Sequence, residues 1–165
     1  MNQAAILTIS DSRSLADDRS GDLISDLLTK NHITIIDRRI VKDDIVDIQT
    51  AFLELEQARP DIIITTGGTG VARRDVTISA VRPLLQRIIP GFGEMFRQIS
   101  FHEIGTRALA SQALAGFNYR WQLTYCLPGS LNACKTALDR LIIPEYQHLL
   151  YEISNQRKDD HNHAH

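Results

Sequence analysis

The stretch Asp61-Ile62-Ile63-Ile64-Thr65-Thr66-Gly67-Gly68-Thr69-Gly70 carries the pattern that decides the fold. Its three consecutive isoleucines are typical of a central parallel strand that is buried on both faces. The strand runs directly into a glycine-rich loop, where backbone amides that no Cβ atom obstructs can converge on phosphate oxygens. The alternative is a tight turn that only needs positive φ angles. We favour ligand binding, because the loop follows the carboxyl end of a strand.

The residues directly after this loop are charged and suggest what the ligand is. The run matches neither G-x-G-x-x-G nor a P-loop, which disfavours a nicotinamide dehydrogenase and a P-loop NTPase. Arg73, Arg74 and Asp75 come next in the chain. Either they form a solvated surface run, or the arginines neutralise a polyphosphate while Asp75 holds a Mg²⁺ ion that bridges it. Their position beside the glycine loop favours the second interpretation.

Strands and helices alternate on both sides of this stretch. Upstream, the pattern predicts a strand over 4–10, a helix capped at Ser20-Gly21-Asp22, a strand over 34–41, and a helix from 45 that ends at Arg59-Pro60. Downstream, it predicts two short helices over 78–89, an amphipathic helix from 92, a short helix over 107–115, a strand over 119–127, a helix from 131 and a last helix opened by Pro144. The fold class is therefore α/β, with three layers and helices on both faces of a mainly parallel sheet.

Two boundaries follow from the composition of the chain. We expect a single domain over 1–153 and a polar, disordered tail over 154–165, which contains three of the six histidines. The apolar stripe at Phe92, Met95, Phe96 and Ile99 is interpreted as core, with a subunit contact as the alternative.

Other polar residues follow strands that should end at the same edge of the sheet. Asp11 follows the first strand, and Asp43 and Asp44 follow the second. One aspartate of the pair is expected to cap the helix that starts at Ile45, which leaves the other free for a ligand. Ser130, after the strand that ends near Leu127, is either an N-cap or an anion contact. Three strands thus bring carboxylates to one rim, as a cation-assisted site requires.

Composition excludes several classes of function. The 165 residues are 43% apolar and 23% charged, with a formal charge of −2, so nothing favours nucleic acid or an acidic membrane as a partner. No signal peptide and no run long enough to span a bilayer are expected. Cys126 and Cys134 match no zinc or redox spacing and predict a reducing cytoplasm. No histidine lies beside a nucleophile in a recognisable motif, which disfavours Cys-His or Ser-His chemistry.

Six motifs together resemble the MoaB/MogA family of molybdenum cofactor biosynthesis proteins, most of all its bacterial MoaB members, over about 4–150. They are Ser10-Asp11-Ser12-Arg13, Thr65 to Gly70 followed by Arg74-Asp75-Val76-Thr77, Pro90-Gly91-Phe92-Gly93-Glu94, Ile104-Gly105, Ala113 to Gly116, and Leu127-Pro128-Gly129-Ser130. The resemblance implies a three-layer domain that binds molybdopterin and forms homo-trimers or hexamers. In competent relatives, the phosphate of the pterin attacks the α-phosphate of Mg-ATP to give adenylylated molybdopterin and pyrophosphate.

The resemblance also assigns roles to individual residues. It places the two active-site aspartates on Asp43 and Asp75, which are expected to be catalytic and to hold Mg²⁺. It places phosphate binding on Gly67, Gly68, Thr69 and Gly70, further cofactor contacts on Arg74, Thr77 and Asp11, and the rim of the pterin pocket on Ser130. A phosphate nucleophile is already ionised at neutral pH, so alignment and charge neutralisation are what the protein must provide.

One departure from the family pattern leaves an alternative open. Many relatives continue with proline and an acidic residue where this chain has Ile78-Ser79. The missing proline weakens the start of a helix, and the missing carboxylate removes a negative charge near the expected metal. The hypotheses are therefore an ATP-dependent molybdopterin adenylyltransferase, an oligomer that binds the pterin or its precursor without turnover, and, least favoured, an unrelated nucleotide-binding oxidoreductase.

Overall fold

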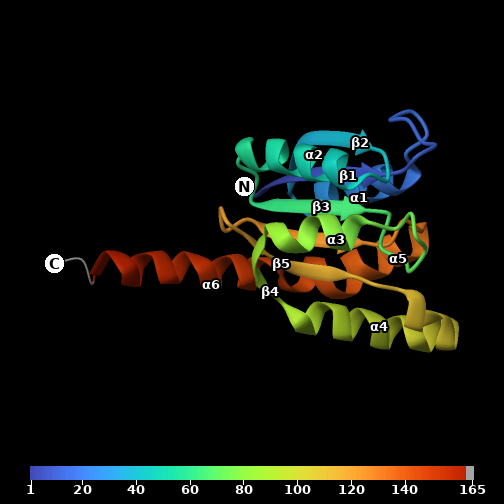
Figure 1. Cartoon of the computed structure of the whole chain (residues 1–165). Helices are drawn as coiled ribbons and strands as arrows, with labels where there is room; N and C mark the ends of the chain where they lie inside the picture. Colours follow the sequence, from blue (N-terminus) through green and yellow to red (C-terminus); the bar gives the residue numbers. More distant parts are fainter. Residues whose placement is uncertain (163–165) are drawn as a thin grey trace.

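Six strands form one sheet in the order β2-β1-β3-β6-β5-β4 (Figure 1). The computed structural model describes residues 1–162, with side chains described as far as Ser154. The strands are Gln3–Ile9 (β1), Thr34–Val41 (β2), Ile62–Thr66 (β3), Leu85–Ile88 (β4), Leu114–Asn118 (β5) and Leu123–Leu127 (β6). The first four strands of this order pair in parallel, whereas β5 runs antiparallel to both of its neighbours. The mainly parallel sheet is confirmed.

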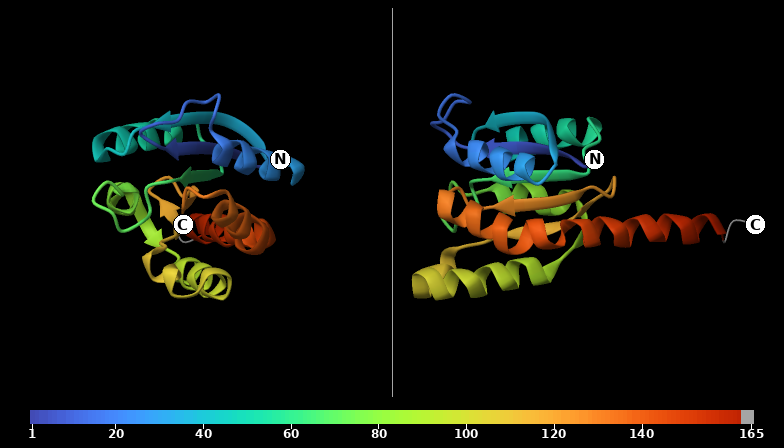
Figure 2. Two further views of the ribbon diagram at one scale, coloured as in Figure 1. Left: turned by 90° about the vertical axis from the view of Figure 1, so that its right-hand side faces the viewer. Right: turned by 180° about the vertical axis from the view of Figure 1, so that it is seen from behind.

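Helices cover both faces of the sheet (Figures 1 and 2). They are Arg19–Lys30 (α1), Ile45–Gln57 (α2), Thr77–Val81 (α3), Pro90–Ile104 (α4), Leu131–Ala137 (α5) and Ile143–Asn162 (α6). Short 3₁₀ turns follow α3 and α4, at Arg82–Leu84 (η1) and Gly105–Ala110 (η2), and a π-turn, Leu138–Ile142 (η3), joins α5 to α6. Helices α1, α4, α5 and α6 pack on one face, and α2 and α3 on the other, which confirms the three layers.

The isoleucines of β3 connect the two halves of the core. Ile62 and Ile64 pack with the helices of one face and Ile63 with those of the other, and all three are fully buried. Burying each of these side chains contributes about 1.5–3 kcal/mol relative to leaving it in water. The run of isoleucines is therefore a central strand, as its sequence predicts.

Two short strands were not predicted. Strand β4 lies where the second of two short helices over 78–89 was expected. Most of η2 and the start of β5 lie where a helix over 107–115 was expected. The expected strand over 119–127 begins only at Leu123, after a turn. Pro83 lies in η1, with which the helical segment ends, and Gly116 of β5 lies where a Cβ atom would come against the backbone oxygen of Arg87. The pairing of β4 with β5 at the edge of the sheet, rather than local preference, decides this region.

The helix boundaries differ from expectation at two further places. Helix α1 is capped by the buried side chain of Asp18, which accepts a hydrogen bond from Gly21 N, and not by the predicted Ser20. Pro144 lies in the first turn of α6, where its missing N–H costs little, and the preceding π-turn keeps the chain helical. Where a disordered tail was expected from 154, α6 continues to Asn162, and residues 163–165 of that tail lie outside the described part.

The strand order positions the site. The chain leaves β1 toward β2 on one side of the sheet, while β3 lies on the other side, so the order reverses between β1 and β3. In open parallel sheets, the crevice outside the carboxyl ends of the strands at such a point is the usual place for ligands. In the described part of the chain, no helix is both long and apolar enough to cross a membrane.

Candidate functional site

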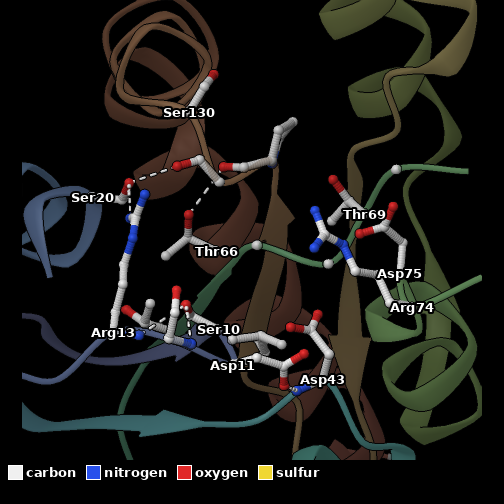
Figure 3. A pocket seen from close by; sticks show the side chains of 18 of the residues that line it. Ser10, Asp11, Arg13, Ser20, Asp43, Thr66, Thr69, Arg74, Asp75 and Ser130 are labelled. Carbon is white, nitrogen blue, oxygen red and sulfur yellow. Dashed lines mark hydrogen bonds between the residues drawn. The ribbon is translucent and has the colours of Figure 1, made fainter. Parts of the chain in front are cut away.

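A cavity of about 600 Å³ lies at the carboxyl ends of the parallel strands (Figure 3). The loops after β1, β2, β3 and β6 all contribute to it, together with η2. It is lined by residues 8–13, Ser20, Asp43, residues 66–70, Arg74, Asp75, Arg107, Ala110, Ser111 and residues 128–130. The predicted site residues Asp11, Asp43, Gly67 to Gly70, Arg74, Asp75 and Ser130 therefore share one cavity.

The glycine loop lines the cavity in a conformation that requires glycine. Gly67 and Gly68 have φ angles of 99° and 68°, in the left-handed region that side chains with a Cβ atom rarely adopt. Gly67 N donates to the carbonyl of Leu127 (2.9 Å), which fixes the loop to the end of β6. A Cβ atom on Gly70 would lie 2.6 Å from Asp75 Oδ2. The loop is thus held in place, and its glycines bring the backbone close to the cavity.

Thr77 supports this loop through two hydrogen bonds. It is fully buried, its Oγ1 donates to Gly67 O (2.8 Å) and its N donates to Gly68 O (3.0 Å). It does not line the cavity, so the expected cofactor contact is replaced by a structural one. Of the ten predicted site residues, Thr77 is the one that the structure separates from the others.

Substitution of Thr77 distinguishes support from ligand contact. Thr77→Val keeps the shape but removes the hydroxyl donor, so we expect the free energy of unfolding to fall by about 1–2 kcal/mol. Thr77→Ser keeps the donor and should lose less. Urea denaturation of both variants measures the difference. A larger loss in Thr77→Ser than in Thr77→Val would mean that the methyl group, and not the hydrogen bond, holds the loop.

Three carboxylates gather along one edge of the cavity. Figure 3 shows Asp11 beside Asp43, with Asp75 next along the same side, and Asp43 N donates to Asp11 Oδ1 (3.0 Å). Burial raises the pKa of Asp43 above its usual value, and the negative charges of Asp11 and Asp75 raise it further. Asp75 Oδ2 accepts from Ala72 N (3.0 Å), which fixes the turn that carries it. This edge has excess negative charge that a bound cation would relieve.

Asp44 resolves the ambiguity of the neighbouring pair of aspartates. Its side chain caps α2 by accepting from Asp47 N (2.9 Å), and it does not line the cavity. Asp43 is therefore the aspartate of the pair that faces the cavity.

The carboxylate edge fits a Mg²⁺ ion that takes its other ligands from substrate phosphates and water. Within the described residues, no group of three or more histidine, cysteine, aspartate and glutamate side chains is arranged to hold a metal ion by itself. Mg²⁺, however, is usually held by one or two carboxylates together with substrate phosphates and waters. The coupled charges of Asp43 and Asp75, close to the glycine loop, match that donor set.

Cations lie on opposite sides of the cavity. Figure 3 shows Arg74 beside Asp75 and Arg13 on the far side, near Ser20. Arg13 Nη1 donates to Ser20 Oγ (3.3 Å), and Ser20 Oγ donates in turn to Gly129 O (2.7 Å). Arg107 of η2 also lines the cavity, whereas Arg73 does not. Positive charge thus comes from Arg13, Arg74 and Arg107, so only Arg74 of the predicted pair Arg73-Arg74 lines the cavity.

Ser130 takes the N-cap role of the two that the sequence left open, and the anion contact stays a prediction. Its side chain caps α5 by accepting from Ala133 N (3.2 Å), and the residue is exposed at the rim of the cavity.

Two arginines of the cavity were missed in the sequence. Arg13 ends the motif Ser10-Asp11-Ser12-Arg13, which follows the first strand. Its position after the carboxyl end of that strand could have identified it as a residue of the site. Arg107 comes from a 3₁₀ turn after α4, and no local pattern points to it.

Comparison with known proteins gives concordant matches. Residues 5–148 match the protein family described as "Probable molybdopterin binding domain". The chain is 46% identical to molybdenum cofactor biosynthesis protein B of Staphylococcus aureus over 155 residues, which is 92% of each chain.

Solved structures agree with these sequence matches. A crystal structure of molybdenum cofactor biosynthesis protein B superposes with a TM-score of 0.89 at 41% identity, covering 93% of this chain and 96% of that one. The tungsten cofactor synthesizing protein MoaB from Pyrococcus furiosus gives 0.85 at 34% identity, covering 92% and 96%.

Proposed function

The chain belongs to the molybdopterin-binding domain family of molybdenum cofactor biosynthesis proteins, and we propose that it adenylylates molybdopterin with Mg-ATP. The pterin and the nucleotide would meet in the cavity at the carboxyl end of the sheet. The observation that carries the proposal is the grouping of the glycine loop, three arginines and three aspartates around one space of about 600 Å³. Polyphosphate and a divalent cation are the ligands that this combination of groups suits.

The proposed reaction makes few chemical demands on the chain. An oxygen of the molybdopterin phosphate attacks the α-phosphorus of ATP, and the bond from that phosphorus to the bridging oxygen breaks. Pyrophosphate leaves with the electron pair, and the products are molybdopterin-AMP and pyrophosphate. The nucleophile carries its own charge, so no side chain has to take up a proton. This agrees with a cavity in which no histidine or cysteine is found among the lining residues described.

The residues of the cavity divide the remaining work. Amides of the glycine loop bind phosphate oxygens, and Arg74 and Arg107 neutralise their charge. Asp43 and Asp75 would hold Mg²⁺, which when bound screens the repulsion between the two phosphates and so allows them to approach. Arg13, fixed by Ser20, closes the opposite side of the cavity.

A second candidate is a pterin-binding protein of the same pathway with little or no turnover. It is favoured by the start of α3, which has neither a capping side chain nor an acidic residue in its first turn. Ile78 and Ser79, however, do not line the cavity. The departure from the family pattern therefore leaves the proposed catalytic groups in place, which supports the enzyme.

The two candidates are separated by one incubation. Purified protein is mixed with molybdopterin and Mg-ATP, and the pterin products are resolved by mass spectrometry. We expect adenylylated molybdopterin in amounts exceeding the enzyme. Binding of molybdopterin without any adenylylated product, even at high enzyme concentration, would support the second candidate instead.

We also propose that the chain forms a homo-oligomer, a trimer or a hexamer, and acts in the cytoplasm. Exposed apolar side chains gather on α4 and η2, namely Met95, Phe101, Ile104 and Leu109, of which Leu109 is 84% exposed. Such side chains are typical of subunit contacts. Light scattering on the purified protein measures the assembly, and a monomer at micromolar concentration would contradict it.

A further inference from the structure

A second cavity, of about 490 Å³, lies at the opposite end of the sheet from the proposed active site. It is formed by the residues before β3, the turn between β5 and β6, and the middle of α6. Figure 1 shows these segments beside the N-terminus, where α6 leaves the sheet, whereas the glycine loop lies beyond the other end of β3. A ligand there would contact none of the residues of the proposed reaction.

One wall of this second cavity is apolar. Leu150 and Ile153 of α6 and Pro60 line it together with Trp121, whose ring packs against Phe117 with centroids 6.1 Å apart. The guanidinium of Arg87 lies over the same ring, 5.5 Å from its centroid. The indole is thus held in place at the edge of the cavity.

The charged groups of the cavity favour an anion. Arg59 and Arg120 line it, and the carboxylate beside them, Asp61, accepts a hydrogen bond from Gln3 N (2.8 Å). Arg120 Nε is 3.7 Å from the buried carboxylate of Glu56. Burial raises the pKa of Glu56, and the positive charge of Arg120 opposes this shift. Arg59 forms no ion pair with any side chain in the described part of the chain. One guanidinium therefore remains for a ligand.

Buried and half-buried hydrogen bonds fix the turn that lines the second cavity. Asn118 Oδ1 accepts from Arg120 N (3.0 Å) and from Gln122 N (2.8 Å). Gln122 Nε2 donates to Glu56 O (3.1 Å), which ties the turn between β5 and β6 to the end of α2. Arg120 and Trp121 are consequently presented on a rigid turn, so a ligand would not have to order them.

We propose that this second cavity binds a small molecule that carries one oxyanion, a phosphate monoester or a carboxylate, on an apolar body. Arg59 and Arg120 hold the oxyanion, and Trp121, Leu150 and Ile153 contact the apolar body. A cavity of this size that combines an apolar wall with few convergent polar groups is typical of sites for small molecules.

The single tryptophan of the chain makes the test direct, because its fluorescence reports on Trp121 alone. The full-length protein is titrated with phenyl phosphate, with benzoate and with inorganic phosphate, while the tryptophan emission is recorded. We expect a saturable change with phenyl phosphate or benzoate, and at least tenfold weaker binding of inorganic phosphate, because it lacks the apolar body. The response to phenyl phosphate against benzoate decides between a phosphate monoester and a carboxylate.

Three variants locate the response. Arg59→Gln should weaken binding about tenfold without removing any ion pair among the described residues. Arg120→Gln should weaken it too, although it also leaves Glu56 without its partner. Asp75→Asn changes only the proposed active site and should bind the probes as the unaltered protein does, so this test is independent of the adenylylation proposal. The inference is overturned if no probe gives a saturable change up to about 10 mM, or if both arginine variants respond like the unaltered protein.

Discussion

Arg38→Met is expected to lower the free energy of unfolding by about 3–5 kcal/mol, because it leaves a buried carboxylate without its cation. Asp18 is fully buried and accepts hydrogen bonds from Thr8 Oγ1 (2.8 Å), Gly21 N (3.0 Å) and Arg38 Nη2 (3.0 Å). Arg38 also forms an ion pair with Asp22 (2.7 Å). Methionine fills similar space but cannot donate to any of these oxygens. Urea denaturation followed by circular dichroism measures the loss.

Arg39→Met is the matched control, one residue further along the same strand. Arg39 pairs with Asp37 and Glu54 on the partly exposed side of β2, where ion pairs contribute less than about 1 kcal/mol. Losses of similar size in the two variants would refute the special role of the buried pair. Since Asp18 ends the loop that carries Asp11 and Arg13, Arg38→Met should also weaken molybdopterin binding.

Asp75→Asn is expected to reduce the rate of adenylylation about a hundredfold or more, because it removes one of the two charges proposed to hold Mg²⁺. The amide oxygen can still accept the hydrogen bond from Ala72 N, so the turn and the stability should be retained. Molybdopterin binding in the absence of Mg²⁺ should change little. Initial rates of pyrophosphate release at saturating Mg-ATP measure the effect.

Asp44→Asn provides the control for the loss of one negative charge. Asp44 caps α2 and does not line the cavity, and asparagine caps a helix about as well as aspartate. Its rate should stay within about twofold of the unaltered protein. If Asp44→Asn and Asp75→Asn were equally slow, long-range charge rather than cation binding would explain both.

The parts of the fold that local sequence predicts are those with strong periodic patterns. Ile62 to Ile64 predicted the central strand, and the helices at Ile45 and Leu131 begin where Asp44 and Ser130 cap them. Strands β4 and β5 could not be predicted, because each is short and is stabilised by pairing with the other at the edge of the sheet. Gly116 permits that close approach, but its local sequence alone is typical of a turn.

The candidate site was predicted better for residues that follow strands than for any others. Asp11, Asp43, the glycine loop and Ser130 all follow strands whose carboxyl ends meet at one edge. Arg107 comes from a 3₁₀ turn and reaches the cavity only through the packing of α4 against the sheet. Thr77 shows the opposite case, since the resemblance assigned it a cofactor contact where the structure has a buried support.

The near-neutral charge of the chain requires the proposed site to supply its positive charge locally. A net charge of −2 offers no general attraction for two polyanionic substrates. Positive potential must therefore be local, and around the cavity it comes from Arg13, Arg74 and Arg107 together with the loop amides. In the proposed reaction, the carboxylates of Asp43 and Asp75 require an added cation. Removal of Mg²⁺ by a chelator should accordingly abolish turnover.

Tracing the phosphorus of ATP tests the central proposal most directly. The protein is incubated with molybdopterin, Mg²⁺ and ATP labelled either at the α- or at the γ-phosphate, and the label is followed into the products. The proposed function predicts that the α-label enters the pterin product and that the γ-label is released as pyrophosphate. Transfer of the γ-label to the pterin, or release of the α-label as free AMP without labelled pterin, would contradict it.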